Sequence, residues 1–178
     1  MAAIIAILTG VAALVFWLGR AAQNAHHITD AANEIANLPR KMRYMKKAGK
    51  SGLSLISDPR EAACVLMIAT ARSGAAGTVT DVESGVIQNM LVETMDWPEE
   101  DAEDFVDSLR WLTRDIKQPD TVLNPMTKFL KSRLSMKEAD ELAHMMTEVA
   151  LAEKTETEKQ TYFIGRYRDM MGLNSRVG

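Results

Sequence analysis

Residues 59–95 read PREAACVLMIATARSGAAGTVTDVESGVIQNMLVETM, and residues 136–171 read MKEADELAHMMTEVALAEKTETEKQTYFIGRYRDMM. Both stretches follow one pattern: an apolar helix that ends in an Ala-x-Ala step, a short turn, and a helix that restarts at a Thr-x-x-Glu motif. In this motif the hydroxyl and the carboxylate each accept a hydrogen bond from a backbone N–H at the helix start. Each stretch therefore predicts one helical hairpin, and the pair predicts a compact all-α bundle.

Helix starts are marked elsewhere in the sequence as well. Capping boxes are predicted at three pairs: Thr80 with Glu83, Ser135 with Glu138, and Thr155 with Glu158. Asp residues close to Pro residues predict three further helices, over residues 58–73, 96–116 and 120–134. The 178 residues include only ten glycines and five prolines and lack strand-like alternation. We therefore predict about six helices and no strand, with the two hairpins flanking a central helix pair.

The apolar positions of the two hairpins predict a shared core. Its expected members are Leu66, Met67, Ile87, Leu91, Leu142, Met145, Val149, Phe163 and Ile164. We also expect a buried, unreactive thiol at Cys64 and a partly buried structural histidine at His144. No Ser-His-Asp order, phosphate-binding glycine loop or paired metal-ligand motif is present, so the sequence does not predict an enzyme.

Residues 2–19 read AAIIAILTGVAALVFWLG and contain no charged residue. A helix of this length spans roughly 27 Å, close to the ~30 Å hydrocarbon core of a bilayer. No basic segment precedes it, which disfavours a cleaved signal peptide, and it has no polar stripe, which disfavours a buried helix of a soluble domain. We predict a transmembrane helix over residues 1–19.

A basic neck is expected over residues 20–57, before the helical domain of residues 58–178. The neck carries seven Lys or Arg and two acids, whereas the domain carries fourteen basic and twenty-two acidic residues. Under the positive-inside rule, the N-terminus lies outside and the domain in the cytoplasm. The neck's cluster is either a solvated topology signal or a contact for anionic lipid headgroups: Arg40, Lys41, Arg43, Lys46, Lys47 and Lys50. The acidic domain disfavours nucleic acid as a partner.

The repeated apolar helix, short acidic turn and Thr-x-x-Glu restart resemble the TerB domain of bacterial tellurite-resistance proteins, over roughly residues 58–173. An anchor before such a domain also resembles the DnaJ-like membrane protein A family. That family carries a J domain with a His-Pro-Asp motif, which this sequence lacks, so co-chaperone activity is not implied. The resemblance implies a TerB-like helical bundle.

The TerB resemblance also implies a divalent-metal site built from acidic residues in and after the two turns. The corresponding residues are Asp81, Glu83, Glu153, Glu156 and Glu158. Hard cations need several converging oxygens, but Arg72 and Lys154 bring positive charge to the same turns. Capping alone accounts for Glu83 and Glu158. We therefore expect no cofactor, with a divalent cation as the alternative.

Acidic residues crowd the start of the helix expected over residues 96–116. They are Glu99, Glu100, Asp101, Glu103, Asp104 and Asp107. Acids near a helix N-terminus are favoured by the helix dipole, which explains part of this enrichment. The alternative is a docking face for a basic partner, formed by Glu99, Glu100, Glu103, Asp104 and Asp107.

These features predict a non-enzymatic, membrane-anchored interaction module, and the resemblance to bacterial proteins implies a bacterial inner membrane. We expect an accessory subunit or assembly factor of a larger complex. Its expected partners are membrane lipids and other membrane-protein subunits, with no nucleic acid and no small-molecule substrate. The alternative, which rests on the resemblance, is a divalent-metal-binding component of a stress or tellurite response.

Small residues recur at every fourth position of the predicted membrane helix, at Ala2, Ala6 and Gly10. Such a ridge lets two membrane helices approach closely. We expect Gly10→Ile to weaken association with a membrane partner, because the larger side chain separates the helices, while insertion is unchanged. Membrane fractionation and co-purification measure the two properties, and normal co-purification of the inserted variant would contradict this expectation.

Overall fold

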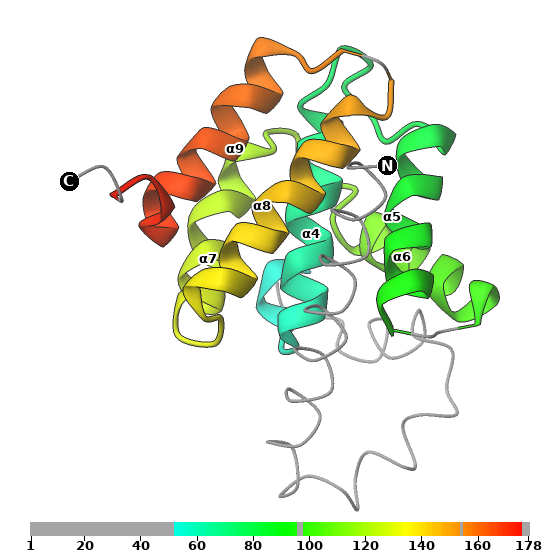
Figure 1. Ribbon diagram of the computed structural model, residues 1–178. Coiled ribbons are helices and arrows are strands. Elements are labelled where there is room, and N and C mark those ends of the chain that lie inside the picture. The colour runs from blue at the N-terminus through cyan, green and yellow to red at the C-terminus, as the bar shows by residue number, and fades with distance from the viewer. Residues whose placement is uncertain (1–51, 96–97, 154, 176–178) are drawn as a thin grey trace, which may run out of the picture.

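The computed structural model describes residues 52–95, 98–153 and 155–175, and these ranges contain six α-helices and no strand. In chain order the elements are η1 (Gly52–Leu55), α4 (Pro59–Arg72), α5 (Asp81–Met95), α6 (Glu99–Leu112), α7 (Asp120–Lys131), α8 (Met136–Leu151), α9 (Glu158–Met171) and η2 (Leu173–Ser175). The elements η1 and η2 are short 3-10 helices. The predicted all-α class is confirmed (Figure 1).

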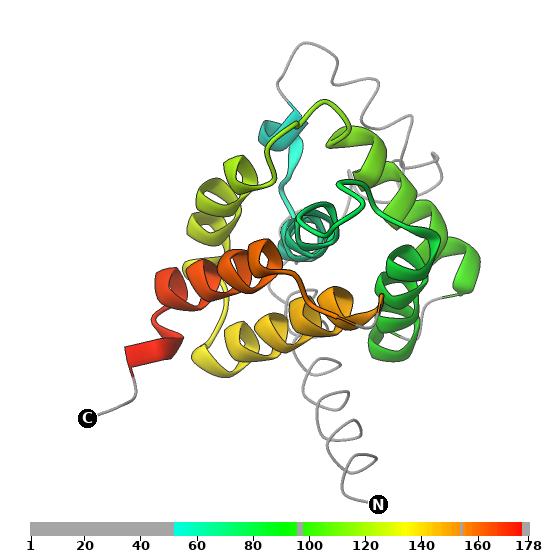
Figure 2. The same cartoon turned by 90° about the horizontal axis from the view of Figure 1, so that it is seen from above.

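Helix α4 runs through the centre of the bundle, and the other five helices surround it (Figure 2). It packs most extensively against α7 and α8 and also contacts α5, α6 and α9. Every residue from Glu61 to Ala71 is buried, so no face of this helix is left to solvent. The expected central pair of α6 and α7 is therefore wrong: these helices lie on opposite sides of α4.

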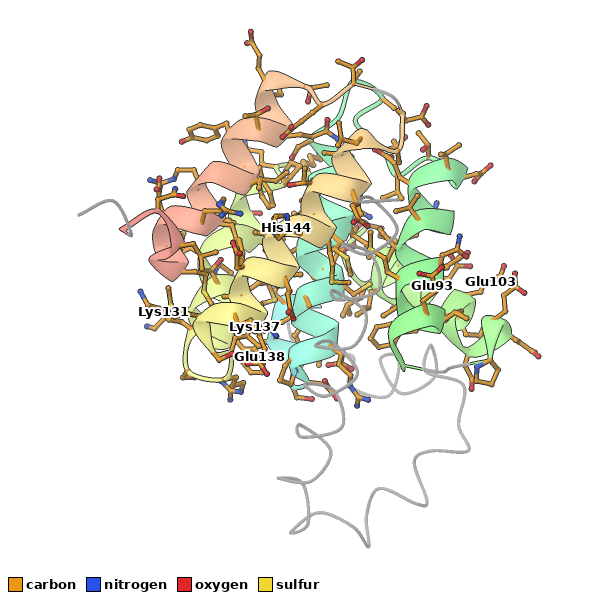
Figure 3. The ribbon with its side chains drawn as sticks, in the orientation of Figure 1. Glu93, Glu103, Lys131, Lys137, Glu138 and His144 are labelled. Atoms are coloured by element: carbon orange, nitrogen blue, oxygen red, sulfur yellow. The ribbon has the colours of Figure 1, made fainter. Side chains whose placement is uncertain are left out.

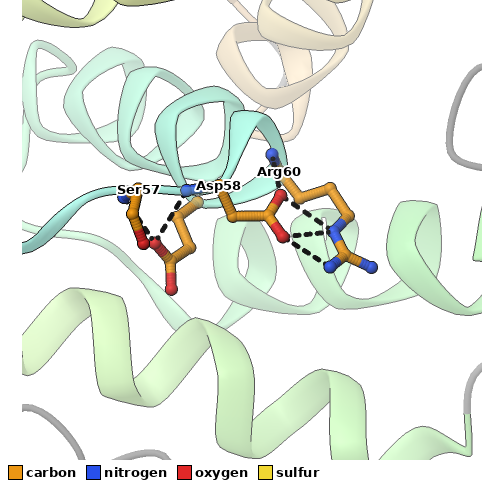
Figure 4. A network of polar contacts seen from close by, with 4 residues as sticks. Ser57, Asp58 and Arg60 are labelled. Atoms are coloured by element: carbon orange, nitrogen blue, oxygen red, sulfur yellow. Dashed lines mark hydrogen bonds and ion pairs between the residues drawn. The ribbon is translucent and has the colours of Figure 1, made fainter. Parts of the chain in front are cut away.

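The N-terminus of α4 is closed by a capping box. The Asp58 carboxylate accepts a hydrogen bond from Arg60 N (2.8 Å), and Glu61 Oε2 accepts one from Asp58 N (3.3 Å). Glu61 Oε2 also accepts a bond from Ser57 N (3.0 Å), and the Arg60 guanidinium pairs with Asp58 (Figure 4). These bonds satisfy backbone donors that a buried helix end would otherwise leave unpaired.

The two repeated stretches differ in how their helices pack. Helices α8 and α9 form a closely packed hairpin, whereas α4 makes only a small contact with α5, which packs chiefly against α6. The difference follows from the position of α4, since α7 and α8 already cover most of its surface. The shared sequence pattern therefore produces two helix pairs with different neighbours.

Of the nine predicted core residues, all except Met145 are buried. Met145 is partly buried against the core, and its neighbour Met146 is fully buried instead. The core also includes Leu55 and Ile56, from the segment that the sequence pattern assigns to the neck. The packed structure thus begins a few residues before Asp58.

Helices α6 and α7 are shorter than predicted. Helix α6 ends at Leu112 rather than Ile116, and the carbonyls of Arg110 and Thr113 at this end accept hydrogen bonds from the Arg72 side chain. Helix α7 ends at Lys131 rather than near residue 134, because Ser135 adopts the extended backbone of an N-cap and the chain has to turn before it. The predicted Ser135–Glu138 capping box at the start of α8 is confirmed.

Among the helices of the described ranges, none is long and apolar enough to cross a bilayer. The predicted anchor of residues 1–19 and the neck up to residue 51 lie outside those ranges. The predictions for Ala2, Ala6 and Gly10, and for the basic residues from Arg40 to Lys50, therefore stay predictions.

Phe163 is fully buried in α9, whereas its neighbour Tyr162 is 60 % exposed. We expect Phe163→Ala to lower the free energy of unfolding by about 3–5 kcal/mol, because it leaves a cavity in the core. The control Tyr162→Ala is expected to change it by less than about 0.5 kcal/mol. The unfolding free energies of both variants are measured by urea unfolding of the full chain in detergent, monitored by circular dichroism. Similar losses of free energy in the two variants would contradict the burial of Phe163.

Candidate functional site

The turn between α4 and α5 and the turn between α8 and α9 meet at one end of the bundle (Figure 1). Together they line a cavity of about 250 Å³, called the end cavity here. Its lining residues are Gly74, Ala75, Ala76, Thr80, Glu83, Ala150, Glu153, Thr155, Thr157 and Gln160. The end cavity combines carboxylates, hydroxyls and an amide from both repeats, which makes it the best candidate for a binding site in the part of the chain described.

Thr80 and Glu83 form the predicted capping box at the start of α5. Thr80 N donates to Glu83 Oε2 (2.9 Å), and Glu83 N donates to Thr80 Oγ1 (3.2 Å). Glu83 is only 3 % exposed, and its other oxygen, Oε1, accepts no hydrogen bond from any residue that the structure describes. Burial raises the pKa of this carboxyl; the bonds from Thr80 oppose the rise, and the charge of Glu153 adds to it.

The capping box at the start of α9 is formed by Thr157 and Gln160, so the predicted pair of Thr155 and Glu158 is wrong. Thr157 N donates to Gln160 Oε1 (2.9 Å), and Gln160 N donates to Thr157 Oγ1 (3.2 Å). Glutamine serves as well as glutamate at this position. Contacts with the first turn favour this register: Thr157 Oγ1 donates to Ser73 O (3.3 Å), and Gln160 is buried.

Gly74 brings the two turns into close contact. A β-carbon at this position would lie 2.9 Å from Ala71 O and 3.0 Å from Gln160 Nε2. Both distances are shorter than an ordinary van der Waals contact, and the Ala71 carbonyl belongs to the backbone and cannot move aside easily. A larger residue would therefore push the first turn away from Gln160 and reshape the end cavity.

The predicted metal residues do not form one site. Glu83 and Glu153 line the end cavity, on opposite sequence repeats. The other three do not line it: Asp81, Glu156 and Glu158. Within the described ranges, no group of three or more His, Cys, Asp and Glu side chains is placed to hold a metal ion.

Arg72 does not place its charge in the end cavity. Its Nη1 donates to Thr113 O (2.7 Å) and Thr113 Oγ1 (3.0 Å), and its Nη2 donates to Arg110 O (3.1 Å). The guanidinium therefore caps the C-terminus of α6. The sequence does not reveal this role, because Thr113 lies 41 residues away along the chain. Lys154, the other cation expected in the turns, lies outside the described residues.

The residues of the predicted docking face lie on the solvent side of α6 and are called the acidic face here. They are Glu99, Glu100, Glu103, Asp104 and Asp107, and all five are exposed. The Glu103 side chain points away from the bundle (Figure 3). Only Asp107 has an ion-pair partner in the described part of the chain, Arg110 at 3.3 Å.

The two side chains with the greatest potential reactivity, His144 and Cys64, do not line the end cavity. His144 is 70 % exposed on α8, so the prediction of a partly buried histidine is wrong (Figure 3). Its Nε2 lies 3.7 Å from Asp140 Oδ2, and Asp140 Oδ1 accepts a bond from Arg168 Nη2 (2.8 Å). Cys64 is buried as predicted, and burial raises the pKa of its thiol, which keeps it unreactive.

No protein-family model, curated protein or solved structure matches this chain. The TerB resemblance therefore remains a prediction from the sequence pattern. A function has to be argued from the end cavity and the acidic face.

The register of the α9 capping box can be tested directly. We expect Thr157→Ala to lower the free energy of unfolding by about 1 kcal/mol, because it removes the side-chain acceptor for Gln160 N. Thr155→Ala is expected to have almost no effect, since Thr155 is exposed and makes no capping bond. Chemical unfolding of both variants measures the difference, and a larger loss in Thr155→Ala would restore the other register.

Proposed function

We propose that this chain is a membrane-tethered, non-enzymatic interaction module that docks a basic partner on its acidic face. The exposure of five carboxylates on one side of α6 carries the proposal. The helix dipole favours acids only in the first turn, which here holds Glu99, Glu100 and Asp101. Glu103, Asp104 and Asp107 lie beyond it, so helix-start preference does not explain them.

The spacing of the carboxylates on the acidic face destabilises α6 when no partner is bound. Glu99 and Glu103, Glu100 and Asp104, and Glu103 and Asp107 are each four residues apart on one helix. Like charges at this spacing destabilise a helix by about 0.2–0.5 kcal/mol a pair. A basic partner would relieve that repulsion and would also gain long-range electrostatic attraction toward this face.

The sequence pattern before the domain supports a tether at a membrane. Residues 2–19 are uncharged and apolar, and six basic residues follow between Arg40 and Lys50. We infer a TerB-like domain held at the cytoplasmic side of a bacterial inner membrane, as an accessory subunit or assembly factor of a larger complex. In that position the tether would raise the effective concentration of the module near other proteins of the same membrane.

A matched pair of triple variants tests the proposal in the full chain. The test variant removes three charges from the acidic face, Glu103→Gln with Asp104→Asn and Asp107→Asn. The control removes three exposed charges elsewhere, Glu148→Gln with Asp115→Asn and Asp120→Asn. Both triples combine one Glu with two Asp and break one surface ion pair, at Arg110 or at Arg114.

Each tagged chain is purified from membranes in mild detergent, and the co-purifying proteins are quantified by mass spectrometry. We expect the partner of the wild type to fall about tenfold in the test variant, from the loss of three interface charges, and to stay unchanged in the control. Recovery of the wild-type chain alone would contradict the proposal. Equal losses in the two triples would also contradict it, since net charge alone would then explain binding.

A further inference from the structure

The end cavity is large enough to receive a side chain from another protein. Its volume of about 250 Å³ exceeds that of an engineered cavity of roughly 150 Å³ that accepts benzene. Thr155 and Glu153, which line it, are both exposed, so the cavity is reached from solvent. The remaining question is which chemical group its walls would bind.

The walls of the end cavity present acceptors from two directions. Glu83 comes from α5 and Glu153 from the turn after α8, and neither forms an ion pair with a basic residue that the structure describes. Glu83 Oε2 is already used in the capping box, but Oε1 accepts no bond there although the side chain is almost fully buried. Glu83 Oε1 is not one of the buried oxygens that lack a partner in the described part of the chain, so solvent in the cavity reaches it and a ligand there could donate to it.

Large hydrophobic side chains are exposed on the three helices that contribute to the end cavity. The described part of the chain exposes four large hydrophobic side chains, and three of them lie within two residues of the cavity lining. These three are Val82, Leu151 and Tyr162, on three different helices.

We propose that the end cavity binds an arginine side chain presented by a partner protein. This inference rests on the proposed function, because it specifies one contact of the basic partner. The planar guanidinium carries five N–H donors in a fixed fork, so one group reaches Glu83 Oε1 on one wall and the Glu153 carboxylate on the other. The hydroxyls of Thr80 and Thr155, which also line the cavity, are further acceptors.

Other ligands fit these walls less well. Two carboxylates repel an anion, although the N-termini of α5 and α9 lie nearby. A divalent cation such as calcium needs 6–8 oxygens at about 2.3–2.6 Å, and no cluster of that kind exists in the described ranges. A lysine ammonium has only three donors on a compact group, so it matches two carboxylates on different walls less well than the guanidinium fork.

Binding is tested on the full chain in detergent micelles with Nα-acetyl-arginine amide as the probe, by saturation-transfer NMR. We expect a dissociation constant of about 1 mM for this single residue and no binding of the isosteric Nα-acetyl-citrulline amide, which lacks the positive charge. Glu83→Gln and Glu153→Gln are each expected to weaken binding about tenfold. Glu158→Gln is the matched control, because Glu158 is an exposed acid near the same turn that does not line the cavity.

The fold is expected to survive these changes. Glutamine at position 83 keeps the capping box, as Gln160 does in the equivalent position of α9. The unfolding midpoints of the variants, compared with that of the wild-type chain, verify this. If Glu83→Gln is unfolded, the binding measured for Glu153→Gln alone decides whether the cavity binds arginine.

Equal binding of citrulline, an equal effect of Glu158→Gln, or displacement of the arginine probe by equimolar calcium or magnesium would each overturn the inference. If the arginine probe does not bind as expected but the acidic-face triple variant still loses its partner, only the arginine contact is contradicted. Absence of any partner of the wild-type chain removes the proposed function itself.

Discussion

The complete burial of α4 is the constraint on which the rest of this structure depends. A helix that is apolar on every side has to be covered on every side, and five helices supply that cover. The buried hydroxyls in and at the end of α4 are satisfied locally: Thr70 Oγ1 donates to Leu66 O (2.9 Å), and Ser73 Oγ donates to Ala69 O (2.9 Å). The arrangement of the other helices follows from the need to surround α4.

The same constraint explains where the end cavity lies. The chain leaves α4 through Ser73 and Gly74, and both are held against the turn between α8 and α9. The capping boxes of α5 and α9 both line the end cavity, because the two helices begin on either side of this contact. The residues that stabilise the helix starts therefore also line the cavity. One of its two carboxylates, that of Glu83, is held in place by the backbone bond from Thr80 N that closes the start of α5.

The two proposed contacts, on the acidic face and in the end cavity, both depend on carboxylates, but these carboxylates differ in their exposure to water. On the acidic face the carboxylates are solvated, so they would attract the proposed basic partner over distance but contribute little each at short range. In the end cavity Glu83 is almost removed from water, so a matching donor there contributes more to specificity. A basic partner with an exposed arginine would engage both, first through long-range attraction and then through one oriented side chain.

Sequence by itself determined the features that depend on neighbours within about four residues. The helical class, the starts of α4, α5 and α8 and most of the core follow from capping boxes and apolar periodicity, because those interactions lie within one turn of helix. Only the tertiary structure decided the centrality of α4, the cap at Thr157 instead of Thr155, the exposure of His144 and the role of Arg72. The choice of Thr157 depends on a carbonyl 84 residues away, at Ser73. Contacts at that separation are set by the packing of whole helices. The local pattern allows a cap at Thr155 or at Thr157, so it carries no information about which of the two the packing selects.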